Sequence, residues 1–315
     1  MGFLGNLTGS NSAAFNFEDN MPSLQGKVIF ITGCDSGIGK QAITYLAQLS
    51  PSEIWLAVRS LDQADVAVAN IRQQVPAAKL QTLQLDLASF SSIKGAAAAF
   101  LAQTKRLDLL ILNAGVMGTA AMRTEDGYEH QFGINYMGHA LLTKLLMPAL
   151  LQTAESQSDV RVIITTSYSH RNAPSGGIDF DTLKTDGGSL PTLKRYAQSK
   201  LANILFARAI AKRYSQLTAL SIHPGAARTG LVLGATGTNI LDRLVGQYVY
   251  RLFVFQPLET VAKHHVWAAV AQDIQSGEYY EPLGIARQGT NEAMDEALAD
   301  KLWDWTEHEL RPYFV

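Results

Sequence analysis

Thr32-Gly33-Cys34-Asp35-Ser36-Gly37-Ile38-Gly39 is the stretch that decides the fold. It follows a short apolar run and leads into a segment with the pattern of a helix. Its three glycines allow a tight turn and a close approach of the backbone to a pyrophosphate, which the N–H groups at the start of the following helix would face. The spacing differs from G-x-G-x-x-G, so a plain strand-to-helix turn is the alternative. We expect Gly33, Asp35, Ser36, Gly37, Ile38 and Gly39 to contact a dinucleotide.

Apolar runs rich in Val, Ile and Leu alternate with helix-like segments on the C-terminal side of this stretch. The runs are Val28–Thr32, Ile54–Val58, Leu80–Leu85, Leu109–Leu112, Val160–Thr166 and Ala219–His223, and a seventh is expected near Glu278–Pro282. The helical patterns are Lys40–Leu49, Asp62–Gln74, Ser91–Gln103, Tyr128–Thr153 and Leu193–Tyr214. This alternation predicts an α/β fold, a doubly wound Rossmann sheet of about seven parallel strands with helices on both faces. We expect one domain over residues 26–315 and a flexible extension, rich in Gly, Ser and Asn, over residues 1–25.

The residue after the second run bears on the choice of cofactor. Ligands of open α/β sheets bind beyond the carboxyl ends of the strands, and an NAD site usually has an acidic residue about 20 positions after the glycines. Arg59 stands there instead. A guanidinium suits a 2′-phosphate, which favours NADP(H). Asp35 could lie near the same phosphate, so NAD(H) is the alternative, and Arg59 could also be an ordinary surface arginine.

Small or polar residues also follow the later runs. Asp86-Leu87 could hydrogen-bond an adenine edge, and Asn113-Ala114-Gly115 would allow a close approach to a ribose. Pro224-Gly225, with Ala227 and Thr229, follows the sixth run. Each of these could be an ordinary turn or helix cap. Their placement at successive strand ends favours one cofactor site.

Tyr196 and Lys200 share a helix face because they are four residues apart, and Ser167 follows the fifth run. A nearby ammonium would lower the pKa of a phenol, which is about 10 when free. The tyrosine could then pass a proton to or from a substrate oxygen, with the serine stabilising the charge that develops there. A bare Tyr-x-x-x-Lys is common on helices, so the strand-end residues carry the argument.

Together these residues resemble the short-chain dehydrogenase/reductase family. The resemblance covers roughly residues 27–229 and is weaker beyond. It rests on Thr32–Gly39, Asp86, Asn113-Ala114-Gly115, Asn135, Ser167, Tyr196, Lys200 and Pro224-Gly225. It implies that Ser167, Tyr196 and Lys200 are catalytic, that Asn135 holds a water beside the lysine, and that Lys200 and Thr229 contact the nicotinamide ribose and carboxamide.

Within the family the chain looks most like the retinol-dehydrogenase-like and WW-domain-oxidoreductase-like branch. The stretches behind this likeness include Asn113–Met117, Glu125–Glu129, Asn135–His139 and Ser276–Tyr280. Cys34-Asp35 replaces the Ala-Asn common in NADP-using members, which leaves the cofactor choice open. Thr165-Thr166 replaces the usual Val-Ser before the catalytic serine.

Residues 230–257 stand where this family has its substrate lid. The segment is rich in Leu, Val, Tyr and Phe, which favours a lipophilic carbonyl or alcohol. A helix pair packed on the core is one alternative, and contact with a membrane surface is another. The long loop 168–194 is expected to form another wall.

The composition excludes several classes of function. The 315 residues carry a formal net charge of −2 and show no basic block, so no nucleic-acid partner is expected. A single cysteine excludes an internal disulfide and a thiolate zinc site, and we predict no metal. The first 26 residues lack Lys and Arg, so no secretory signal is expected. We expect a cytoplasmic enzyme that could form a homodimer; an NAD-dependent dehydrogenase and a catalytically silent nucleotide sensor or scaffold are the rival hypotheses.

Overall fold

The computed structural model describes residues 17, 21–156, 159–227, 256–287 and 289–314. Its centre is one sheet of eight strands in the order β3-β2-β1-β4-β5-β6-β7-β8. The strands are β1 (Val28–Thr32), β2 (Glu53–Val58), β3 (Leu80–Gln84), β4 (Leu109–Leu112), β5 (Arg161–Thr165), β6 (Thr218–Ile222), β7 (Tyr279–Tyr280) and β8 (Ala286–Arg287). All neighbouring pairs are parallel except β7 with β8. The predicted doubly wound sheet is therefore confirmed.

The strand β8 was not predicted. It consists of two exposed residues, Ala286 and Arg287, paired antiparallel with β7. Two residues are too few to show an alternating pattern, and neither is apolar and buried. The other strand boundaries differ from the predicted ones by a residue or two.

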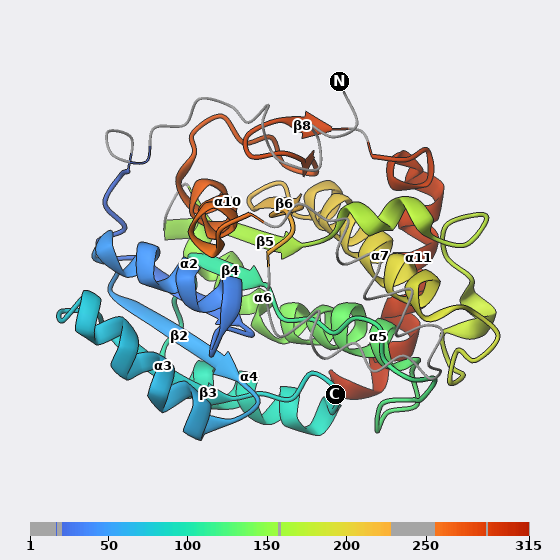
Figure 1. Cartoon of the computed structure of the whole chain (residues 1–315), viewed down its shortest axis with the longest axis horizontal. Helices are drawn as coiled ribbons and strands as arrows, with labels where there is room; N and C mark the ends of the chain where they lie inside the picture. The colour runs from blue at the N-terminus through green and yellow to red at the C-terminus, as the bar shows by residue number, and fades with distance from the viewer. Residues whose placement is uncertain (1–16, 18–20, 157–158, 228–255, 288, 315) are drawn as a thin grey trace.

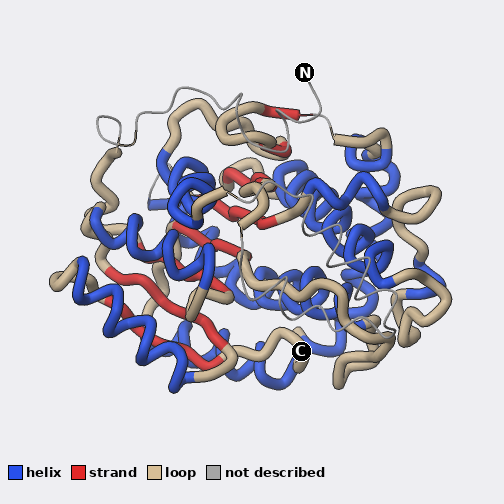
Figure 2. The backbone as a smooth tube through the Cα atoms, in the orientation of Figure 1, coloured by secondary structure: helices blue, strands red, loops and turns tan. Residues whose placement is uncertain are grey.

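Helices cover both faces of the sheet, as Figures 1 and 2 show. Strand β1 is buried throughout, with Phe30 in one hydrophobic cluster and Ile31 in the other. The cluster around Phe30 contains residues of α4 (Phe90–Gln103), α6 (Gly138–Ser156), α7 (Thr192–Arg213) and α11 (Glu296–Leu310). The cluster around Ile31 contains residues of α2 (Gly37–Gln48), α3 (Leu61–Gln74) and α10 (Leu258–Val270). Burial on both faces explains why the strands are apolar runs without alternation.

The long helix expected over Tyr128–Thr153 is interrupted in the structure. It begins as α5 (His130–Phe132), passes through a π-helical segment at Gly133–Met137, and continues as α6. Such π segments often occur at functional sites. This one contains Asn135, a residue of the predicted site.

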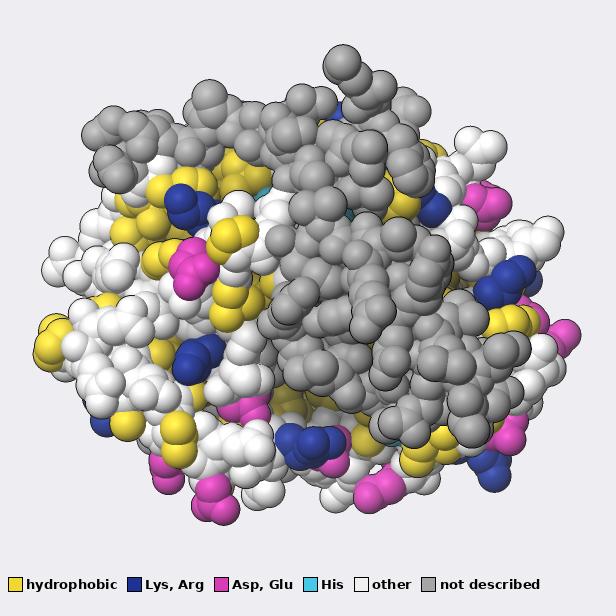
Figure 3. Space-filling model, in the orientation of Figure 1, with side chains coloured by type: hydrophobic (Ala, Val, Ile, Leu, Met, Phe, Trp, Pro, Cys, Tyr) yellow, Lys and Arg dark blue, Asp and Glu magenta, His cyan; other side chains and the backbone are white. Residues whose placement is uncertain are grey.

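The last residues of the expected N-terminal extension pack on the core. Leu24 is buried in the cluster around Ile31, and its backbone N–H donates to the carbonyl of Leu49 at 2.8 Å. Phe17 and Met21 pack against the same cluster, so the described part of the expected extension contributes to the core. On the face shown in Figure 3, charged side chains of both signs lie scattered over the described surface.

Candidate active site

The glycine stretch forms the turn between β1 and α2. Gly33 and Gly37 have φ values of +63° and +56°, which side chains rarely allow. A Cβ on Gly39 would lie 2.7 Å from Nδ2 of Asn113 and would also meet the carbonyl of Gly33. Ser36, at the start of α2, makes no side-chain cap, and the first turn of the helix has no acidic residue. This end of α2 therefore presents N–H groups to a cradle that fits a phosphate.

Asn113 braces this turn. Its Nδ2 donates to the carbonyls of Thr32 and Gly33 at 3.0 and 2.8 Å. Its backbone N–H and that of Ala114 both donate to Oγ1 of Thr32, each at 3.0 Å. The amide nitrogen of Asn113 therefore donates within the protein, across to the β1 turn, and not within a local turn of its own.

His139 links the turn to Asn135. Oγ1 of Thr32 already accepts two N–H groups, so its proton is donated to Nε2 of His139, 2.9 Å away. The ring proton then lies on Nδ1, which donates to the carbonyl of Asn135 at 3.0 Å. Burial lowers the pKa of His139 to about 4, which keeps the ring neutral. Sequence reasoning did not find this residue, because a buried helix histidine carries no signal of its own.

Asn135 holds the loop that follows β4. Its Nδ2 donates to the carbonyl of Val116 and to Oγ of Ser199, both at 2.9 Å, and its Oδ1 accepts the N–H of Val116 at 2.8 Å. Both amide hydrogens are therefore used by protein partners. A water at this residue, as the family resemblance implies, could meet only acceptor atoms of Asn135.

Tyr196 and Lys200 lie on α7 and are almost completely buried. Nζ of Lys200 lies 5.8 Å from the centre of the Tyr196 ring and donates to the carbonyl of Thr165 at 3.1 Å. A Cβ on Gly115 would lie 3.1 Å from Oδ1 of Asn135 and 3.4 Å from Nζ of Lys200, so both groups face this glycine. The structure thus brings Gly115, Asn135, Tyr196 and Lys200 together.

Ser167 completes the group. It follows β5, begins a short 3-10 turn, and its Oγ accepts the N–H of Ser169 at 3.2 Å. Burial raises the pKa of Tyr196 to about 12, and a hydrogen bond with Ser167 acts in the opposite direction. Burial also lowers the pKa of Lys200 to about 8. Loss of solvation is the largest influence on the Tyr196 pKa, and the Lys200 ammonium donates to the carbonyl of Thr165. The effect of Lys200 on the phenol stays a prediction.

The remaining predicted cofactor residues lie along the carboxyl edge of the sheet. Arg59 is exposed at the end of β2. Oδ1 of Asp86 accepts the N–H of Ala88 at 2.9 Å, as a turn aspartate does, and Leu87 is buried.

Gly225 has a φ of +100°, between buried Pro224 and Ala227. Asp35, Ser36 and Ile38 lie in or beside the glycine turn, partly or fully exposed. Thr229 and residues 230–255 of the expected lid lie outside the described residues.

Two further properties concern the described residues only. They contain no group of three His, Cys, Asp or Glu side chains that could hold a metal ion. None of their helices has the length and apolar character that crossing a bilayer requires.

Comparisons with known proteins establish the family of this chain. The model of the short chain dehydrogenase family matches residues 27–180. Human retinol dehydrogenase 13 is 37% identical over 287 residues, which cover 89% of this chain and 83% of the human protein. The chain belongs to the short-chain dehydrogenase/reductase family. Its predicted likeness to retinol dehydrogenases is confirmed, and the chain is an oxidoreductase of this family.

Other short-chain dehydrogenase/reductase relatives cover nearly the whole chain. An uncharacterised oxidoreductase of Schizosaccharomyces pombe is 34% identical over 308 residues, which cover 95% of this chain and 89% of the yeast protein. The crystal structure of an uncharacterised protein from Mycobacterium paratuberculosis superposes with a TM-score of 0.73 at 27% identity, covering 95% of this chain and 98% of that one. The similarity thus extends beyond the glycine turn and α7 to the C-terminal elements.

Proposed function

We propose that this chain is an NADP(H)-dependent oxidoreductase that interconverts a carbonyl and an alcohol on a lipophilic small molecule. The observation that carries the proposal is the convergence of Ser167, Tyr196, Lys200 and Asn135 beside the glycine turn. All four side chains are present and in contact with one another or with shared neighbours. A nucleotide sensor or scaffold would not require this arrangement.

The roles follow from the chemistry of each group. The nicotinamide supplies or accepts the hydride. Tyr196 gives its phenolic proton to the carbonyl oxygen during reduction, and Ser167 hydrogen-bonds the same oxygen. Lys200 places a positive charge beside the phenol and Asn135. Burial keeps Tyr196 protonated at neutral pH, so its proton is present for the reduction, and the charge of Lys200 would stabilise the phenolate that remains when the proton is given up.

The cofactor residues would be those at the carboxyl edge. Gly33–Gly39 and the start of α2 would hold the pyrophosphate, and Arg59 the 2′-phosphate. Exposed Arg59 has room to form such a fork, which supports NADP(H). Asp35, in the glycine turn, supports NAD(H) as the second candidate, because a carboxylate would repel the phosphate.

A lipophilic substrate is supported by two observations. Residues 230–255 are rich in Leu, Val, Tyr and Phe and stand where this family has its lid. The human relative is named for retinol, an apolar alcohol. The proposal extends to that class of molecule and to no single member of it.

The test of the proposed function is turnover by wild type and Tyr196→Phe on a panel of lipophilic ketones, aldehydes and alcohols. Loss of the phenolic acid should lower kcat by about 10²- to 10⁴-fold. Tyr136→Phe is the matched control, because Tyr136 is also buried but its hydroxyl contacts Thr306 of α11 at 2.7 Å. No hydride transfer by the wild type, or full activity of Tyr196→Phe, would refute the enzyme hypothesis.

The cofactor proposal has its own test. Initial rates with NADPH and NADH on one carbonyl substrate should favour NADPH. Arg59→Ala should raise KM for NADPH about tenfold or more and leave KM for NADH nearly unchanged, since one charge-assisted fork to the 2′-phosphate is lost. A preference for NADH that Arg59→Ala does not alter would establish the NAD-dependent alternative.

A further inference from the structure

An ion pair with almost no access to solvent lies beside the catalytic tyrosine. Nη1 of Arg195 is 2.8 Å from Oε1 of Glu129, and the two residues are 3% and 0% exposed. Arg195 directly precedes Tyr196 at the start of α7. The proposed proton transfer uses neither charge. Since a buried ion pair contributes little net stability compared with well-packed apolar residues, its presence here requires another explanation.

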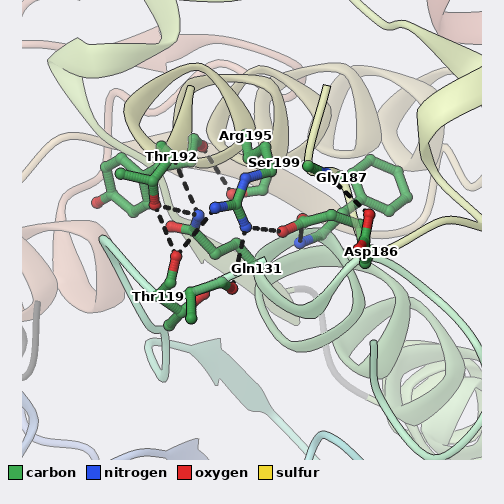
Figure 4. Close-up of polar contacts among 12 residues, drawn as sticks. Thr119, Gln131, Asp186, Gly187, Thr192, Arg195 and Ser199 are labelled. Atoms are coloured by element: carbon green, nitrogen blue, oxygen red, sulfur yellow. Dashed lines mark hydrogen bonds and ion pairs between the residues drawn. The ribbon is translucent and has the colours of Figure 1, made fainter. Parts of the chain in front are cut away.

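Arg195 also binds the loop that leaves β4. Its Nη2 donates to the carbonyl of Thr119 at 3.0 Å, and its Nη1 to that of Ala120 at 3.3 Å. This loop continues from Asn113-Ala114-Gly115 and Val116, which Asn135 holds. One guanidinium therefore ties the loop on one side of the site to the helix turn that carries the tyrosine, as Figure 4 shows.

Gln131 and Thr192 make a second connection between the same parts. Oε1 of Gln131 accepts the N–H of Gly118 at 2.9 Å, while its Nε2 donates to the carbonyl of Thr192 at 3.0 Å. Oγ1 of Thr192 donates to the carbonyl of Thr119 at 2.9 Å. The loop is thus fixed by side chains from both the helix of Asn135 and the helix of Tyr196 (Figure 4).

Through Glu129, the ion pair is also linked to the helix that carries Asn135. Its Oε2 caps α5 by accepting the N–H of Phe132 at 2.7 Å, and the chain continues from there into the π segment. Gly187 covers the pair: a Cβ there would lie 2.5 Å from Cδ of Arg195 and 2.7 Å from Cγ of Glu129. With φ at +72°, this glycine closes the loop before α7 over both charges.

We propose that Arg195 and Glu129 are positioning residues that fix the α5 end of the Asn135 helix, the 118–120 loop and the Tyr196 turn of α7 relative to one another. The inference rests on the proposed function, because the reaction that the pair would support is the proposed carbonyl reduction. A guanidinium suits the task because its planar fork can bind a carboxylate and two carbonyls at once, and a lysine ammonium cannot match that geometry. A displacement of the reacting groups by about 1 Å is enough to cost about 100-fold in rate.

The experiment compares Arg195→Met, Arg195→Lys and Glu129→Gln with wild type in NADPH-dependent carbonyl reduction. We expect kcat to fall about 10- to 100-fold in Arg195→Met and about fivefold or more in Arg195→Lys. The Kd of NADPH, measured by fluorescence titration, should change less than about twofold, because the side-chain polar contacts of Arg195 and Glu129 are with each other, the 119–120 carbonyls and Phe132, and none is with the glycine turn or α2. Arg195→Lys retains the charge and carries the test if Arg195→Met or Glu129→Gln does not fold.

The matched control is Arg161→Met. Arg161 is 5% exposed and forms an ion pair with Asp159 at 2.7 Å. It lies at the amino end of β5, whereas Ser167 follows the carboxyl end of this strand. This variant should lose thermal stability and keep its kcat per folded molecule. Unchanged kcat in folded Arg195→Lys and Arg195→Met, or an equal loss in Arg161→Met, would overturn the inference.

Hydrogen exchange separates this inference from the proposed function. Deuterium uptake in residues 116–137 and 192–200 should rise in Arg195→Lys and stay at the wild-type level in Arg161→Met. If the wild type transfers no hydride at all, the proposed function fails, and this exchange pattern alone decides whether the pair fixes the two helices. Wild-type exchange in both segments of Arg195→Lys would overturn the pair's role whatever the activity.

Discussion

At the scale of single residues, the buried charge of Lys200 lowers the stability of the folded protein. Its ammonium lies in a buried position where the described residues offer it one carbonyl, that of Thr165, and no carboxylate. Burial lowers its pKa from 10.5 to about 8. The folded state therefore holds the proton less tightly than the unfolded state. Stability is reduced by this charge below about pH 8 and recovers as the pH rises toward 10.5.

Lys200→Met should stabilise the protein and abolish its turnover. The lowered pKa of Lys200 corresponds to about 3 kcal/mol, so we expect the free energy of unfolding at pH 7 to rise by about 1 to 3 kcal/mol. The carbonyl of Thr165 keeps the donor Nδ2 of Asn203 at 3.0 Å. Urea unfolding of both proteins at pH 7 and pH 10 measures the effect, and the gain should shrink at the higher pH. A less stable variant at pH 7 would contradict it.

The sequence predicts the role of a residue that belongs to a motif. It does not predict a role that depends on a contact with a residue far away in the sequence. Tyr196, Lys200 and Ser167 meet as the sequence indicated. Asn113 was expected near a ribose, which stays a prediction; that its amide donates to carbonyls 80 and 81 residues away in sequence could not be predicted. Arg195 and Glu129 would be interpreted as exposed helix charges, because no sequence pattern reports their burial.

At the scale of elements, the break between α5 and α6 has a tertiary cause. A Cβ on Gly133 would meet the side chain of Thr124, and a Cβ on Gly138 would lie 2.5 Å from the carbonyl of Leu87. The helix approaches both neighbours too closely for any side chain. The spacing of apolar residues predicted one continuous helix, because it carries no information about such close contacts with other segments. The two glycines five residues apart were the only local signal.

Gly138→Ala and Gly95→Ala should therefore change stability in opposite directions. Gly95 lies within α4, and a Cβ on it would meet nothing within 4 Å, so alanine there should stabilise the protein by about 0.5 to 1 kcal/mol. Alanine at position 138 should destabilise it by about 1 to 3 kcal/mol through overpacking against Leu87. Chemical unfolding of the two variants provides the comparison. Equal effects would show that the approach of the helix to Leu87 is not tight.

At the scale of the whole molecule, buried neutral histidines set the response to acid. Burial lowers the pKa of His139, His170 and His265 to about 4 and that of His264 to about 3. The unfolded chain takes up protons near pH 6.5, whereas these folded side chains do not. These histidines therefore do not affect stability above pH 6.5, and they reduce it progressively as the pH falls from 6.5 to 4.

We expect this loss to be large enough to unfold the protein above pH 4. Each of the four histidines contributes on the order of 3 kcal/mol over this range, and their sum is comparable with the whole stability of a typical domain. Urea midpoints at pH 7.5, 6.0 and 5.0 should fall steadily below pH 6.5. A constant midpoint over this range would contradict the burial of uncharged rings.

The overall architecture was the part of the molecule that the sequence predicted best. Strand-sized apolar runs alternating with helical segments are sufficient to indicate a parallel sheet, and the glycine turn indicates which end binds. The strand β8 and the helices α10 and α11 were not predicted. The two helices lie beyond the first six apolar runs, and they pack against α2 and α7, respectively.

The most direct test of the central claim follows the hydride itself. Wild type and Tyr196→Phe are incubated with NADPH carrying deuterium at both C4 positions of the nicotinamide and with a lipophilic ketone, and the alcohol is examined by mass spectrometry. We predict that the wild type yields an alcohol one mass unit heavier, with deuterium on the former carbonyl carbon, and that Tyr196→Phe yields at least about 100-fold less of it. An alcohol without deuterium, or equal labelling by both proteins, would contradict the account.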